Sequence, residues 1–157
     1  MALSKGSPAP DFQLTSKGDD GLVDIRPSDN LGQRPVVLLF FPLAFAPPCQ
    51  AELCTMRDSL KDYEELDAAI YGISVDSPFS QEAFAKANHL NFPLLSDFNK
   101  EVSTAYDVLY QELLGLNGVA KRSVFVIGKD GIILHSSSNE DPGVQPDFDE
   151  IKAALAG

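Results

Sequence analysis

The sequence contains two cysteines, and both lie in one short stretch, residues 40–54. Cys49 follows the most apolar run of the chain, residues 36–41, and precedes a pattern of apolar residues with helical spacing. A thiol at a junction between a strand and a helix lies where free N–H groups and the positive end of the helix dipole stabilise a thiolate. The position therefore predicts that Cys49 is a reactive thiol rather than a small buried hydrophobic residue.

Two prolines precede Cys49 and limit where the helix can begin. Pro48 forces Pro47 away from helical geometry, so we expect the helix to begin no earlier than Pro48. Proline is well tolerated at the first helical position, because the N–H that it lacks would have no partner there. Cys49 is thereby expected in the first turn, where the pKa of a thiol can fall well below its free value of about 8.5.

Cys54 lies five residues after Cys49 on the same predicted helix. An ideal helix, with a rise of about 1.5 Å per residue and a radius of about 2.3 Å, separates the two Cα atoms by about 8–9 Å. A disulfide requires about 7 Å or less, so these cysteines cannot bond while the helix is intact. Either they never pair, or the first turns unwind during a catalytic cycle. Cys54 is accordingly a packed helix residue or a resolving thiol.

A metal site is the other use that these thiols could have, with His89 and His135 as further ligands. The C-x4-C spacing on one helix and the two scattered histidines match structural zinc patterns poorly. We therefore predict no metal site. We interpret His89 as a residue at a helix C-terminus and His135 as an exposed strand residue.

The composition is that of a globular protein with an acidic surface. The 157 residues are 44% apolar and 22% charged, which suits one domain with a real core, predicted over residues 1–157. The net charge of −11 argues against nucleic acid and against an anionic membrane as partners. No segment is long enough to cross a bilayer, and residues 1–10 do not have the pattern of a signal peptide. With only two cysteines, we expect a reducing, cytoplasmic location.

The rest of the chain predicts alternating strands and helices around the cysteine stretch. Turn residues at 18–21 and at 128–131 indicate an N-terminal hairpin and a second hairpin near the end. Expected strands span 12–14, 22–25, 36–41, 68–75, 92–95, 123–127 and 132–135, with a loop over 28–33. One expected helix has Cys49 in its first turn, and a second runs from a cap at Ser77 to about His89. Two more cover residues 99–106 and 147–156. This order favours an α/β fold with a central mixed sheet between helices, which a thioredoxin-like fold satisfies.

The segment from Pro42 to Glu52 resembles the active-site segment of the peroxiredoxins, P-x-x-x-[T/S]-x-x-C-x-x-E. The resemblance covers most of the chain, since residues 6–12, 74–80, 92–97 and 121–127 are similar to other landmarks of the family. The spacing of the two cysteines resembles the bacterioferritin-comigratory (Q-type) subgroup. Residues 43–45 and 50–53 also resemble the one-cysteine AhpE-like subgroup.

The resemblance implies a thiol peroxidase that reduces hydrogen peroxide or organic hydroperoxides. Cys49 would attack the O–O bond as a thiolate and become a sulfenic acid, and Cys54 would resolve it as a disulfide. Arg122 would keep the thiol ionised and bind the peroxide, as a fixed cation can. Pro42 would shape the loop and shield the sulfur, and Glu52 would orient the arginines of the site. Thioredoxin or a similar dithiol would regenerate the protein, which would be a monomer or a homodimer, and no metal or organic cofactor is implied.

Arg122 and Glu52 also have plainer interpretations that do not use the resemblance. Arg122 can be a surface cation in a strand. Glu52 can be a carboxylate that is merely favourable in the first turn of a helix.

Two residues depart from the family pattern. The Thr or Ser of the motif is Ala46, and the residue before the cysteine is Pro48, which has no N–H. By analogy with an oxyanion hole, each missing donor costs about 3–4 kcal/mol, or about 10²–10³ in rate. Either the Cys49 N–H, Arg122 and water substitute for these donors, or the enzyme is slow.

The missing donors motivate an alternative function, a degenerate family member that acts as a redox sensor or binding module with little turnover. A thiol-disulfide oxidoreductase is disfavoured, because such enzymes use C-x-x-C whereas the spacing here is C-x4-C.

Overall fold

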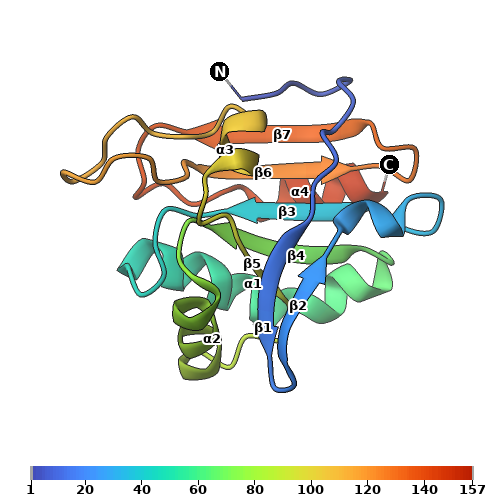
Figure 1. Ribbon diagram of the computed structural model, residues 1–157. Helices are drawn as coiled ribbons and strands as arrows, with labels where there is room; N and C mark the ends of the chain where they lie inside the picture. The colour runs from blue at the N-terminus through green and yellow to red at the C-terminus, as the bar shows by residue number, and fades with distance from the viewer. Residues whose placement is uncertain (1, 157) are drawn as a thin grey trace.

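The computed structural model describes residues 2–156, so Met1 and Gly157, the two ends of the predicted domain, lie outside the described part. One seven-stranded mixed sheet runs through the molecule in the order β2-β1-β5-β4-β3-β6-β7 (Figure 1). The strands are β1 (Leu14–Gly18), β2 (Gly21–Ile25), β3 (Val36–Phe40), β4 (Ala69–Ser74), β5 (Leu94–Ser96), β6 (Arg122–Ile127) and β7 (Ile133–Asn139). The helices are the 3₁₀ helix η1 (Pro27–Asn30), α1 (Pro47–Glu65), α2 (Pro78–Ala87), α3 (Glu101–Ala105) and α4 (Phe148–Ala156). The predicted alternation of strands and helices is confirmed.

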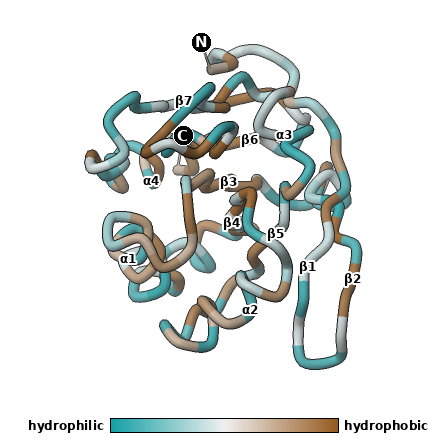
Figure 2. Tube along the Cα trace, turned by 60° about the vertical axis from the view of Figure 1, so that its left-hand side comes forward, coloured by the Kyte–Doolittle hydropathy of each residue, from teal (hydrophilic) through white to brown (hydrophobic). Residues whose placement is uncertain are grey.

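β3 is an interior strand of the sheet, between β4 and β6, and its sequence, VVLLF, is apolar on both faces. It pairs in parallel with β4 and antiparallel with β6, and all five of its side chains are buried. Val37 and Leu39 belong to the core on one face of the sheet, and Leu38 and Phe40 to the core on the other. Figure 2 shows the hydrophobic stretches gathered in these central strands. A strand covered on both sides is what an unbroken apolar run predicts.

The two faces of the sheet are covered by different elements. α1, α2 and α4 supply Leu53, Phe84 and Ile151 to the core that contains Val37. α3 supplies Val102 to the opposite core. None of the helices within residues 2–156 is long and apolar enough to cross a bilayer.

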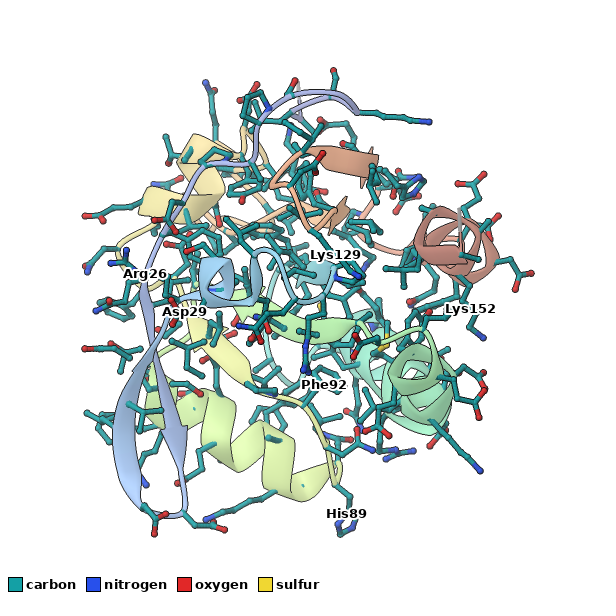
Figure 3. All side chains as sticks on the ribbon, turned by 90° about the vertical axis from the view of Figure 1, so that its right-hand side faces the viewer. Arg26, Asp29, His89, Phe92, Lys129 and Lys152 are labelled. Atoms are coloured by element: carbon teal, nitrogen blue, oxygen red, sulfur yellow. The ribbon has the colours of Figure 1, made fainter. Side chains whose placement is uncertain are left out.

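Lys152 joins α4 to α1. Its Nζ lies 3.1 Å from a carboxylate oxygen of Asp62 and 5.6 Å from the ring centre of Tyr63, both on α1. Figure 3 shows Lys152 between the two helices. The contact fixes the C-terminal helix beside the helix that carries both cysteines.

The predicted cap of α2 is confirmed, since the Ser80 N–H donates to the Ser77 hydroxyl at 3.2 Å. α1 begins at Pro47, one residue before the predicted start. The two prolines fit at the first two helical positions because N–H groups there have no acceptor within the helix.

The N-terminal hairpin differs from the prediction in its extent. β1 begins at Leu14, where the expected strand ends, because its pairing with β2 is set by the turn that closes Gly18 against Gly21. The following loop contains η1, a 3₁₀ turn that the sequence pattern did not indicate.

Candidate active site

A short loop carries the chain from β3 to α1 at one end of the sheet. The Phe41 N–H donates to the Ile73 carbonyl at 3.0 Å, which continues the pairing of β3 with β4. The Ala44 N–H donates to the Asp76 carboxylate at 2.8 Å, just beyond the end of β4. The loop before α1 is therefore held by the strand next to it and not by its own residues alone.

Phe45 makes the sharpest bend of this loop. Its φ is 69°, in the left-handed region that a bulky residue rarely adopts. Its ring lies 5.2 Å from the ring of Phe84 on α2, in an edge-to-face arrangement that offsets part of the backbone strain. After this bend, Ala46 is the N-cap of α1, and Cys49 is the third residue of the helix.

Arg122 joins the elements of the site. It is the first residue of β6, its side chain is 2% exposed, and its guanidinium has three partners. Nη2 donates to Cys49 Sγ at 3.1 Å, Nη1 donates to the Glu52 carboxylate, and Nε donates to the Pro142 carbonyl at 2.9 Å. Because β6 runs antiparallel to β3, its first residues lie beside the end of β3, where the loop to Cys49 begins. The structure thus brings Cys49, Glu52 and Arg122 together, as the resemblance to the peroxiredoxins implies.

The Cys49 thiol is 1% exposed and belongs to the core that α1 covers. Burial raises the pKa of Cys49, against the lowering effects of the Leu43 N–H, which donates to the sulfur, and of Arg122, while the charge of Glu52 raises it further. The sequence predicts a lowered pKa from the helix start alone, and this prediction was wrong for the structure. The first turn of α1 lies against the sheet, so the loss of water outweighs the dipole. How much thiolate forms therefore depends on Arg122, which favours it, and on Glu52, which opposes it.

Glu52 is fully buried beside Arg122. Its Oε2 accepts the bond from Arg122, and its Oε1 has no hydrogen-bond partner within residues 2–156. Burial raises the pKa of Glu52 to about 7, although Arg122 acts in the opposite direction. The carboxyl group of Glu52 consequently titrates near neutral pH, far above an ordinary glutamate.

The other predicted residues of the site lie around the thiol. Pro42 is buried at the end of β3, and Ala46 and Pro48 are half-buried at the start of α1. Ala46 forms no side-chain cap, and neither residue supplies a donor to the site. The Leu43 N–H and Arg122 are the donors to the Cys49 sulfur that the described residues provide.

Cys54 faces a different part of the molecule. Its Sγ lies 3.6 Å from Oδ1 of Asn88, the residue that follows α2, and Arg57 donates to the Asn88 carbonyl at 2.5 Å. Cys54 is partly exposed, and both cysteines are free. The structure does not bring Cys54 to Cys49, as expected for an intact helix.

The two histidines lie apart from the thiols. His89 is exposed beyond the end of α2, where it points away from the molecule (Figure 3), and His135 on β7 lies 3.9 Å from Glu150. Within residues 2–156, no group of three or more His, Cys, Asp or Glu side chains is arranged to hold a metal.

The loop between β7 and α4 contributes two contacts that the sequence did not indicate. Pro142 offers its carbonyl to Arg122, and Gln145 Nε2 donates to the Pro48 carbonyl at 2.8 Å. A backbone carbonyl carries no signal of residue type, and 97 residues separate Gln145 from Pro48. Pro142 and Pro146 favour a loop before the last helix, but they do not indicate what that loop contacts.

A buried thiol that an arginine holds at the start of a helix, on a sheet of this order, defines a thiol peroxidase site on a thioredoxin-like fold. Residues 5–136 match the AhpC/TSA family. The chain is 41% identical over 133 residues to alkyl hydroperoxide reductase E of Mycobacterium bovis, covering 83% of this chain and 82% of that protein. It is 40% identical over 146 residues to the chloroplastic 2-cysteine peroxiredoxin of Chattonella marina var. antiqua, covering 88% and 72%. The crystal structure of peroxidoxin BcpB from Mycobacterium tuberculosis superposes with a TM-score of 0.85 at 34% identity, covering 98% and 97%.

The chain therefore belongs to the AhpC/TSA family. The resemblance to the peroxiredoxins, the thioredoxin-like α/β fold and the class of thiol-dependent peroxidase are confirmed by these relatives. The relatives do not favour a degenerate binding module.

Replacing Arg122 with glutamine is expected to make Cys49 less reactive. The substitution removes the only cation that contacts the sulfur among the described residues, so the pKa of Cys49 should rise further. A nearby opposite charge shifts a pKa by about one to three units, so alkylation of Cys49 by iodoacetamide near neutral pH should slow by at least about ten-fold. The rate is measured by mass spectrometry in a Cys54→Ser background. Arg34→Gln, an exposed arginine before β3, is the matched control and should leave the rate unchanged.

Replacing Gln145 with leucine is expected to loosen the first turn of α1. One hydrogen bond contributes about 1 kcal/mol, so the amides of residues 50–53 should exchange with deuterium about five-fold faster in the reduced protein. Gln33→Leu, at an exposed position before β3, should leave this exchange unchanged. Equal exchange in the wild type and in Gln145→Leu would show that the bond to Pro48 has no effect on the helix start.

Proposed function

We propose that this chain reduces hydrogen peroxide or organic hydroperoxides through Cys49. The thiolate attacks one oxygen of the peroxide, an S–O bond forms, and the O–O bond breaks. The products are a sulfenic acid on Cys49 and water or an alcohol, once the leaving oxygen has taken a proton. The observation that carries the proposal is the 3.1 Å contact between Arg122 Nη2 and Cys49 Sγ in a member of the AhpC/TSA family.

The other residues of the site support this step. Arg122 stabilises the thiolate and the negative charge that develops on the leaving oxygen. The Leu43 N–H donates to the sulfur and partly replaces the donors that Ala46 and Pro48 do not supply. Pro42 lines the loop and keeps water from the buried sulfur. A site with so few donors relies on Arg122 more heavily than one with a complete set.

Cys54 is the proposed resolving thiol. It is partly exposed on α1 and attacks the Cys49 sulfenic acid, which releases water and forms a disulfide. Because the intact helix keeps the Cα atoms about 8–9 Å apart, the first turns of α1 must unwind before the bond can form. Thioredoxin or a similar dithiol donor then reduces the disulfide.

The cysteine content and the net charge of the chain support a proposal for its compartment and its partners. We place it in a reducing compartment, the cytoplasm, although the relative from Chattonella marina var. antiqua is named as a chloroplastic protein. The acidic chain acts without nucleic acid or membrane as a partner, and as a monomer or a homodimer.

A stopped-flow experiment tests the peroxidase and the role of Cys54 together. Wild-type protein mixed with hydrogen peroxide should oxidise Cys49 much faster than a free thiol reacts. Mass spectrometry should then show a disulfide between Cys49 and Cys54, with loss of helical circular dichroism as α1 unwinds. Cys49→Ser should abolish the reaction, and Cys54→Ser should stop at the sulfenic acid.

Two outcomes would contradict these proposals. A wild-type rate no faster than that of free cysteine would rule out the peroxidase. A fast rate that yields only sulfenic or sulfinic Cys49 would make Cys54 structural, with a one-cysteine route for reduction.

Restoring the missing donors should accelerate the reaction. Ala46→Thr introduces a hydroxyl at the N-cap of α1, and combining it with Pro48→Gly restores an N–H. One donor in an oxyanion hole contributes about 10²–10³ in rate, so even an imperfectly placed hydroxyl should raise the peroxide rate at least about ten-fold. Ala46→Val has nearly the shape of threonine without the hydroxyl, and it should give no gain. Equal rates for the threonine and valine variants would mean that the site does not use a donor at this position.

A further inference from the structure

The buried site holds one permanent cation and two acids. Arg122 donates to Cys49 through Nη2 and to Glu52 through Nη1, so both acids contact the same guanidinium. Cys49 and Glu52 are three residues apart on α1 and therefore lie on the same side of the helix. Both are almost completely buried, so little water is present to compensate a second negative charge. The cluster of these three residues is neutral when one of its two acids is ionised.

The other groups near the cluster leave this charge balance unchanged. The loop between β7 and α4 offers Arg122 the Pro142 carbonyl, which is uncharged. Tyr110 donates its hydroxyl to a backbone carbonyl at 2.5 Å, and burial raises its pKa, so it stays neutral. Asp147 and Glu150 line a cavity together with Arg122, but both are exposed, so water and salt screen their charges.

The carboxyl group of Glu52 is the stronger of the two acids. The ordinary pKa is about 4.3 for glutamate and about 8.5 for cysteine. Burial raises the pKa of Glu52 to about 7, and it raises the pKa of Cys49 from a value that is already higher. When the cluster has lost one proton, the carboxylate therefore carries the charge and the remaining proton stays on the thiol.

We propose that Glu52 restrains Cys49, because its carboxylate takes the charge of Arg122 and keeps the proton of the cluster on the thiol. The inference rests on the proposed function in taking Cys49 as the nucleophile, and it concerns what limits that nucleophile. Glu52 is a positioning residue, since it acts on the sulfur through the guanidinium that both groups contact. If Glu52 served only to orient Arg122, its loss would make the thiol less reactive. As a restraint, the loss of its charge makes the thiol more reactive.

The restraint has a pH dependence of its own. Because burial raises the pKa of Glu52 to about 7, its charge is present above about pH 7 and lost below it. Once one proton has left, the remaining proton divides between the two acids in a ratio that pH does not change. The thiolate fraction should therefore grow slowly above about pH 7 until a second proton leaves, as coupled acids do. An isolated thiol below its pKa would still gain about ten-fold per pH unit.

Alkylation of Cys49 provides the first test, in protein that carries Cys54→Ser and keeps Glu52. Iodoacetamide reacts with the thiolate, so its rate reports the thiolate fraction, and mass spectrometry measures it. A neighbouring charge shifts a pKa by about one to three units, so the rate should rise less than about five-fold from pH 7.5 to pH 8.5. A rise of about ten-fold over this interval, as for an isolated thiol, would overturn the proposal.

Glu52→Gln in the same background provides the second test, because the amide has nearly the shape of the carboxyl group but no charge. At pH 6 both proteins should be alkylated at nearly equal rates, since Glu52 is mostly protonated there. At pH 8.5 the variant should react at least about three-fold faster, because the thiolate then has Arg122 to itself. Glu64→Gln, at an exposed position of the same helix, should leave the rate unchanged at both pH values.

The comparison of the two pH values separates the restraint from structural effects. If Glu52→Gln were faster by the same factor at pH 6 and at pH 8.5, the substitution would only have opened the site. A variant that is slower at both pH values would assign Glu52 to orienting Arg122. Either result would overturn the proposal.

Failure of the proposed function would look different. A peroxide rate no faster than that of a free thiol would overturn the peroxidase, whereas the alkylation rates do not involve peroxide. They would still decide whether Glu52 restrains the Cys49 thiol.

Discussion

The site depends on the guanidinium of Arg122, which binds three separate parts of the chain at once. It contacts the thiol and the carboxyl group of α1 through its two terminal nitrogens and the loop after β7 through Nε. A lysine has a single charged nitrogen, so it cannot donate to all three of these partners in a fixed geometry. The arginine is itself placed by the pairing of β6 with β3, which sets the first residue of β6 beside the point where the chain leaves the sheet. The pairing of β6 with β3 therefore positions the cation of the site.

Burial makes this arrangement both necessary and sensitive. An exposed thiol at the start of a helix would gain from the dipole, but Cys49 has lost its water and has an elevated pKa. A single charged partner then decides how much thiolate is present, and Glu52 competes for that partner. Coupled groups of this kind titrate as a unit, so the pH dependence of the reaction belongs to the cluster and not to Cys49 alone.

Much of the fold and site could be predicted because the informative residues are local. The apolar run of β3, the prolines before Cys49 and the Ser77 cap each identify an element from a few neighbouring residues. The pKa of Cys49 could not be predicted in this way, because it depends on how deeply the tertiary packing buries the helix start. Nor could the contact of Pro142, since it uses a carbonyl that every residue has. Arg122 and Glu52 were found through a resemblance, since neither residue type marks its position as special.

The loop that closes the site lies outside the segment that matches the family, which ends at residue 136. Pro142 and Gln145 nevertheless contact the arginine and the start of the cysteine helix. Selection can therefore alter the electrostatics of the thiol and the opening of its helix by changing this loop, while every residue of the shared motif stays the same. Two family members with identical motifs can differ in reactivity for this reason, and a comparison of motifs alone would not reveal the difference.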